Sequence, residues 1–157
     1  MNPGTLGSGI SDIPDAAVDL LTSGVHVAHL ATSHEDRPHV AAVWYVYHEA
    51  AIELVTTGKK LENIRRNPRV ALSVEHSEDG AAKWGVTMLG TATVVTDETE
   101  GCEILHRINS RYGAAEDEYA ENTPVRIDVG SVDHWIYRRS RPSATGLVPE
   151  ASPSSSC

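Results

Sequence analysis

TTGKKLENIRRNPRVAL, residues 56–72, joins two β-rich runs through one short helix. Hydroxyl residues and a glycine end the first run, and Lys59 and Lys60 open the helix. Asn67-Pro68 closes the helix before a second β-rich run starts at Arg69. Free N–H groups and two cations at one helix N-terminus form a favourable site for a phosphate group. The segment therefore predicts strand, helix, strand, with an anion site at the two lysines.

The composition predicts one domain in a reducing compartment. The chain has 157 residues, of which 40% are apolar, and its net charge is −9. This acidity argues against nucleic acid or an anionic membrane as a partner. No apolar run approaches the ~20 residues that cross a membrane, and we see no signal peptide. With only Cys102 and Cys157, a disulfide framework is not expected, so we predict a cytoplasmic protein.

Composition also predicts where the folded domain begins and ends. Residues 1–12 are rich in glycine and serine, and we expect them to be loose. Residues 139–157 are dominated by proline, serine and glycine with little to bury, so we expect a disordered tail. The predicted domain therefore spans residues 1–138, with 1–12 as its loose start.

Short β-rich runs outnumber helices in the remainder of the chain. Helices are expected from residue 15 to about Gly24, at 59–66, and from the Thr96–Glu100 cap to about Gly113. Strands are expected at 25–32, in a hairpin over 39–57, at 69–75, at 84–96, and as a final pair at 124–129 and 132–137. About six strands without βαβ alternation favour an antiparallel barrel or sandwich. No GxGxxG or GxxxxGK motif occurs.

Four segments resemble one cofactor-binding family in order and spacing. They are HVAHLATSHEDRPHVAAVWYVY (26–47), LVTTGKKLENIRRNPRVALSV (54–74), WGVTMLGTATVV (84–95) and RIDVGSVDHWIY (126–137). The chain resembles the FMN-binding split β-barrel superfamily, which includes pyridoxamine 5′-phosphate oxidase and the flavin/deazaflavin oxidoreductases. The resemblance implies a mainly β, antiparallel split barrel with flanking helices. It also implies a homodimer that holds two FMN molecules in clefts between its subunits.

The same resemblance implies which residues contact the cofactor. The strand from His39 through Val40, Ala41, Ala42 and Val43 to Trp44 would lie along the isoalloxazine ring. Thr56 and Thr57 would stand near the ring or the ribityl chain, and Lys59 and Lys60 would bind the phosphate. Trp84 and Gly85 occupy the place of a ring-contacting strand, and Trp135 that of an aromatic residue near the flavin. No catalytic residue is implied, because hydride chemistry belongs to the cofactor.

Each of these signals also has a purely structural interpretation. Core packing would explain Trp44, Trp84 and Trp135. Arg65, Arg66 and Arg69 are better read as solvated, or paired with Glu62 and Glu75, than as ligands. The eight histidines have no spacing typical of a zinc site, so no metal is expected.

Three functions stay open from the sequence. The first is an FMN-dependent oxidoreductase that acts on a small organic substrate by hydride transfer. The second is a reductase that uses the deazaflavin F420, with Arg65 and Arg66 near its anionic tail. The third is a non-catalytic module that holds flavin, or haem with His39 or His134 as ligand. Residues 136–142 lack the Arg-Leu-His segment of true pyridoxamine phosphate oxidases, so vitamin B6 oxidation is not implied.

Overall fold

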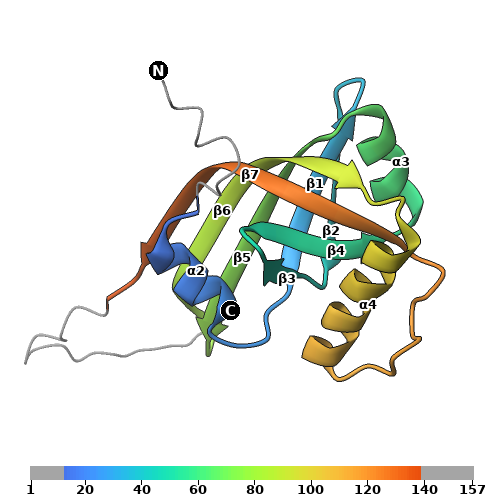
Figure 1. Cartoon of the computed structure of the whole chain (residues 1–157). Helices are drawn as coiled ribbons and strands as arrows, with labels where there is room; N and C mark the ends of the chain where they lie inside the picture. Colours follow the sequence, from blue (N-terminus) through green and yellow to red (C-terminus); the bar gives the residue numbers. More distant parts are fainter. Residues whose placement is uncertain (1–12, 139–157) are drawn as a thin grey trace, which may run out of the picture.

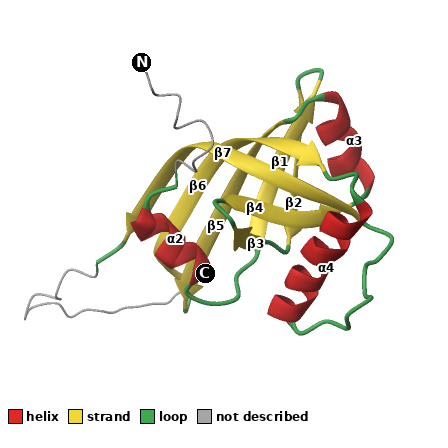
Figure 2. Ribbon diagram, viewed as in Figure 1, coloured by secondary structure: helices red, strands yellow, loops and turns green. Residues whose placement is uncertain are grey.

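Seven strands and three helices make up the described part of the chain. The computed structural model describes residues 13–138; the segments expected to be loose, 1–12 and 139–157, lie outside the described residues. The elements are α2 (Asp15–Thr22), β1 (Ala28–His34), β2 (Arg37–Val43), β3 (Val46–His48), β4 (Ala51–Thr56), α3 (Gly58–Arg66), β5 (Arg69–Glu78), β6 (Ala81–Val94), α4 (Glu98–Tyr112) and β7 (Thr123–Ile136). The expected mainly β fold with flanking helices is confirmed (Figure 2).

All seven strands form one antiparallel sheet in the order β2-β1-β5-β6-β7-β4-β3. The strands number seven rather than the expected six or so. The two edge strands, β2 and β3, are joined by only Trp44 and Tyr45. The sheet must therefore curve until its edges meet at this connection, as the wrapped ribbon in Figure 1 shows. Within the described residues no ladder of hydrogen bonds closes the sheet between β2 and β3.

The hydrophobic core fills the inner face of this curved sheet. α2 covers one end of the core, where the Tyr45 hydroxyl donates to the carbonyl of Leu21 at 2.7 Å. α3 covers the other end and contributes Ile64 to the core. α4 packs outside the sheet, against the opposite face of β4, and buries Ile104 and Ile108 there (Figure 1). Its start is capped by Asp97, whose carboxylate accepts the N–H of Glu100 at 2.9 Å.

Three tight hairpin turns set the register of the sheet. Their central pairs are Glu35-Asp36, Glu49-Ala50 and Asp79-Gly80, and all six residues have positive φ. Two successive positive φ values are the mark of the type I′ turn, whose twist matches that of the strands. The expected polar turn at 34–38 and the connection at 48–50 are confirmed, and the loop at 77–80 tightens because β5 and β6 run further than expected.

Two sequence expectations about the strands are wrong. Residues 39–57 do not form one hairpin: the run breaks at Trp44 and Tyr45, so β2 pairs with β1 and only β3 pairs with β4. The two final strands, 124–129 and 132–137, are one continuous strand, β7. The register on β6 shifts at Leu89/Gly90, whose partners are Ser131 and Val129. Gly130 is thus a bulge residue and not a turn, so the strand continues past it.

Candidate functional site

The N-terminus of α3 has the features of an anion site. Gly58 has φ +67°, a left-handed conformation that lets the chain turn sharply out of β4 into the helix. Thr57 precedes it as the N-cap residue, but its side chain caps no backbone N–H. Lys59 is exposed and Lys60 half-buried, and neither forms an ion pair within residues 13–138. The helix start therefore offers free N–H groups and two unpaired cations together.

Thr56 supplies an independent sign that this site is built for a polar ligand. Its side chain is 1% exposed, and its Oγ1 has no hydrogen-bond partner among the described residues. A buried hydroxyl without a partner costs about 1–3 kcal/mol, so such groups are rare unless a ligand or water satisfies them. Thr56 is the last residue of β4, immediately before the α3 turn.

The two asparagines of the motif hold α3 against β1. The buried amide of Asn63 donates to the hydroxyl of Thr32 at 3.0 Å, and that of Asn67 donates to Ser33 at 3.2 Å. Sequence reasoning recognised these asparagines as part of a family motif but gave them no role. Their role is to fix the position of the helix, and so of the lysines at its start.

β2 presents an open backbone edge. It pairs only with β1, so one side of the segment from His39 to Val43 keeps its N–H and C=O groups free within the described structure. The Nδ1 of His39 is buried without a hydrogen-bond partner. Trp44, just beyond the strand, stacks on Tyr112 of α4 with ring centroids 4.6 Å apart. Sequence reasoning missed this partner.

Tyr112 ties α4 to the connection between β2 and β3. Its hydroxyl donates to the carbonyl of His26 at 2.5 Å and accepts the N–H of Tyr45 at 3.0 Å. Burial raises the pKa of Tyr112, with the backbone hydrogen bond at Tyr45 and the charge of Arg111 acting in the opposite direction. Burial also raises the pKa of Tyr45, helped by Tyr112. Both phenols therefore stay protonated and keep Trp44 in place.

The remaining predicted cofactor contacts, Trp84, Gly85 and Trp135, lie on β6 and β7, away from the start of α3. Gly85 and Trp135 are cross-strand partners on β6 and β7, and the half-buried indole of Trp135 has an Nε1 without a partner. Trp84 is buried in the core, edge-on to His26 at 4.9 Å. Burial, followed by the charges of His76 and Arg111, lowers the pKa of His26.

The candidate residues form two groups, and the second lies far along β7 from the start of α3. Thr56 pairs with Thr123 at the start of β7, whereas Trp135 stands twelve residues further along the same strand. At ~3.3 Å per residue the two positions are separated by roughly 40 Å along the strand. The first group contains His39 to Trp44 and Thr56 to Lys60; the second contains Trp84, Gly85 and Trp135.

A cavity of about 290 Å³ adjoins the first group. It is lined by Val27, Ala42, Val43, Trp44, Val55, Tyr119 and Asn122. The sequence predicted three of these residues as cofactor contacts: Ala42, Val43 and Trp44. It missed Tyr119 and Asn122, which lie in the acidic loop between α4 and β7. The available signal was Tyr119, the one aromatic residue in that loop.

Comparison with known proteins finds one matching family and a set of similar structures. The sequence profile of the pyridoxamine 5′-phosphate oxidase family matches residues 14–136. A FAD-binding protein of Mesorhizobium loti is 23% identical with a TM-score of 0.60, over 76% of this chain and 89% of its own. An F420 reductase is 25% identical with a TM-score of 0.59, over 73% and 94%. The haem storage protein HutZ of Vibrio cholerae is 17% identical with a TM-score of 0.64, over 78% and 93%.

A search of curated proteins found no match to the chain. Across residues 13–138, no helix has both the length and the apolar character needed to span a membrane.

Proposed function

Because the chain belongs to the pyridoxamine 5′-phosphate oxidase family, we propose that it is an FMN-dependent oxidoreductase acting on a small organic substrate. The observation that carries the proposal is the start of α3, where, within residues 13–138, Lys59 and Lys60 form no ion pair and the buried hydroxyl of Thr56 has no hydrogen-bond partner. FMN would supply the hydride chemistry, and the protein would bind and orient it.

The donor set at α3 fits a phosphomonoester. Such a group carries up to two negative charges and several acceptor oxygens, and charge-assisted bonds are about twice as strong as neutral ones. Lys59 and Lys60 match the charge, while the uncapped N–H groups and Thr56 match the acceptors. The open edge of β2 adds free backbone donors and acceptors suited to the rim of a flavin ring.

A homodimer would complete this site. The second group of candidate residues, with Trp135 over Gly85, stands twelve residues along β7 from Thr123, the partner of Thr56 just before α3. In a twofold dimer the partner would bring that group to the cofactor, as the family resemblance implies. The split barrel that the family implies is consistent with a sheet whose edges converge at Trp44 and Tyr45.

The outer face of the sheet carries a surface suited to the second copy. Val40, Ala31, Ala71 and Leu89 are successive cross-strand neighbours on β2, β1, β5 and β6. Val40 is 64% exposed and Leu89 56% exposed, with the two small alanines between them. Packing a symmetric copy on this row, here called the apolar row, would remove two large apolar side chains per chain from water.

A deazaflavin is the second candidate cofactor. Arg65 and Arg66, in the last turn of α3, are exposed and form no ion pair in the described structure. Together with Lys59 and Lys60 they extend the basic surface along the helix. A cofactor such as F420, with a longer anionic tail than FMN, would use that whole surface.

The test is a visible spectrum of the purified protein, followed by titration with FMN and then with F420. The decisive variant is Lys59→Ala combined with Lys60→Ala, and the matched control is Lys83→Ala, the only other lysine in the chain. We expect tight FMN binding that the double variant weakens at least 100-fold and the control leaves unchanged.

Other outcomes separate the alternatives. Binding of F420 alone, weakened by Arg65→Ala with Arg66→Ala, would replace FMN with the deazaflavin. A Soret band would indicate haem, and bound FMN that no electron donor reduces would favour a storage module. If neither flavin binds, the proposed function is wrong.

A further inference from the structure

The cavity beside Trp44 is used only in part by the cofactor proposal: Ala42, Val43 and Trp44 are predicted flavin contacts, whereas its other lining residues have no role so far. It lies between β2, β4 and the loop that connects α4 with β7. No charged residue lines it; its walls are valines, an alanine and the rings of Trp44 and Tyr119. The amide of Asn122 is the strongest polar group in the lining, and it forms no side-chain hydrogen bond in the described structure.

The wall formed by Tyr119 is held in place by the fold. Asn109 of α4 is buried and donates through its amide to the carbonyls of Glu116 at 3.1 Å and Glu118 at 2.8 Å. The N–H of Asn122 then donates to the carbonyl of Tyr119 at 2.9 Å, which closes the turn. Tyr119 has φ +63°, a conformation that costs a non-glycine residue free energy and persists because its surroundings fix it.

Trp44 forms an equally fixed wall. One face of its indole is covered by Tyr112, whose ring is nearly parallel to it at 9°. The ring of Tyr119 meets Trp44 edge-on, at 86° with centroids 5.5 Å apart. A cavity bounded by two fixed rings and branched aliphatic side chains favours a flat, apolar molecule over a flexible or charged one.

We propose that this cavity binds the substrate, a neutral, flat, unsaturated small molecule that accepts a hydrogen bond from Asn122. The volume of about 290 Å³ is near the lower end of the ~300–1,000 Å³ that small-molecule pockets span. The neutrality follows from the uncharged lining. The inference rests on the proposed function, because the position of Ala42 and Val43 beside the cavity would place such a molecule next to a flavin lying along β2.

The test uses the FMN-loaded protein and 1,4-naphthoquinone, a neutral and flat probe with carbonyl acceptors, with Kd measured by calorimetry. Val27→Phe fills the cavity from a side chain that is 43% exposed, so folding should persist. We expect it to weaken probe binding at least 10-fold, and Asn122→Ala to weaken it about 3- to 10-fold. Glu121→Ala, an exposed neighbour in the same loop, is the control and should change nothing.

The Kd for FMN is measured on the same variants. An unchanged FMN Kd together with weaker probe binding supports a substrate cavity. Weaker FMN binding with unaffected probe binding would show that the cavity belongs to the flavin ring and would overturn the inference, while leaving the proposed function intact. If the wild type binds no FMN, the proposed function fails independently of the cavity. The same variants are then titrated with naphthoquinone alone, and an unchanged Kd for naphthoquinone in Val27→Phe would overturn the proposed substrate cavity.

Discussion

Trp135 lies so close over Gly85, its cross-strand partner, that a Cβ on Gly85 would come within 2.1 Å of the indole Cζ2. The neighbouring indole atoms Cη2 and Cε2 would lie at 2.5 and 2.6 Å. The absence of a side chain at Gly85 therefore leaves the space that the Trp135 ring occupies. Any side chain at position 85 would force the indole away from the sheet.

Gly85→Ala should displace the Trp135 indole and destabilise the fold by about 1–3 kcal/mol, the usual range for overpacking. Tryptophan fluorescence should shift to longer wavelength as the half-buried ring moves into water, and urea unfolding would measure the loss of stability. Gly130→Ala is the matched control on β7, because a Cβ there meets nothing within 4 Å. Equal stability of the two variants would contradict the close contact.

The apolar row gives a second prediction. Leu89→Lys places a charge at the β6 end of the apolar row, on one of its two large exposed side chains, so we expect a dimer Kd at least about 100-fold weaker, equivalent to ~2.7 kcal/mol. Sedimentation velocity across a concentration series would measure it. Thr91→Lys lies on the same strand and is also exposed, but stands outside the row, so it should remain dimeric. A wild type that sediments as a monomer would disprove this interface.

The class of fold was predictable because local signals agreed with it. β-rich runs, the helix opened by Lys59 and the cap at Asp97 all form as expected. The strand pairing was harder to predict. The run of β-formers from His39 to Tyr47 contains no sign that the chain changes strand partner at Trp44. The contact that marks this change comes from Tyr112, which is distant in sequence and hydrogen-bonds to the backbone of Tyr45. Gly130 looked like a turn because a bulge uses the same residue type.

The candidate site was predictable in its residues more than in its arrangement. The phosphate-binding features at α3 are local, so a short motif contains them. The separation of Trp135 from that motif depends on how β4 and β7 pair. Tyr119 reaches the cavity because the amide of Asn109 fixes the loop at the carbonyls of Glu116 and Glu118. That loop has no sequence pattern typical of a helix or a strand, so the sequence does not predict its position.

The buried tyrosines predict how stability depends on pH. An ordinary tyrosine has a pKa of 10.0, and burial raises the pKa of both Tyr45 and Tyr112 in the folded protein. Above pH 10 the unfolded chain therefore releases protons that the folded chain retains, so stability present below pH 10 falls as the pH rises. Tyr45 alone should account for a loss of about 1–2 kcal/mol at pH 11.

Urea unfolding between pH 8 and pH 11 would measure this loss. Tyr45→Phe should make the curve of stability against pH flatter, whereas Tyr137→Phe, which removes an exposed ring, should leave its slope unchanged. Absorbance at 295 nm should show two tyrosines that ionise well above pH 10. Their absence from the titration curve would contradict the burial of the pair.

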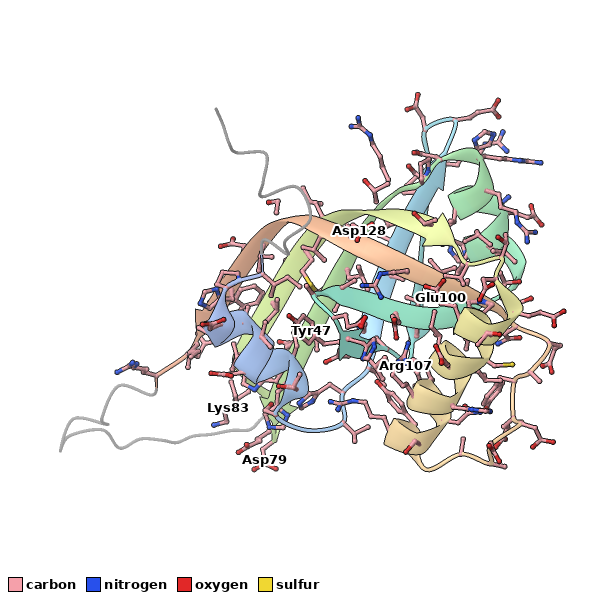
Figure 3. All side chains as sticks on the ribbon, in the orientation of Figure 1. Tyr47, Asp79, Lys83, Glu100, Arg107 and Asp128 are labelled. Carbon is pink, nitrogen blue, oxygen red and sulfur yellow. The ribbon has the colours of Figure 1, made fainter. Side chains whose placement is uncertain are left out.

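The attachment of α4 to the sheet depends on a carboxylate with two cationic partners. Glu53 of β4 is fully buried, and it accepts hydrogen bonds from Arg107 Nε at 2.9 Å and from Arg126 Nη1 at 2.8 Å. Figure 3 labels Arg107 on α4, at the side that faces the strands. The two arginines are 30% and 26% exposed, so water screens them in part while the carboxylate depends wholly on them.

Glu53→Gln keeps the shape of the side chain but removes the charge that the two guanidinium groups share. It also turns an amide N–H₂ toward one of them. Breaking a buried ion pair costs about 3–5 kcal/mol, and the partial exposure of the arginines should reduce this to about 2–3 kcal/mol. Urea unfolding would measure the change, with Glu103→Gln, an exposed acid on α4, as the control expected within ~0.5 kcal/mol of wild type.

Because α4 also carries Tyr112 and Asn109, the glutamine variant should in addition weaken naphthoquinone binding in the cavity beside Trp44. A variant that loses stability without any change in that Kd would show that α4 keeps its position through apolar packing alone.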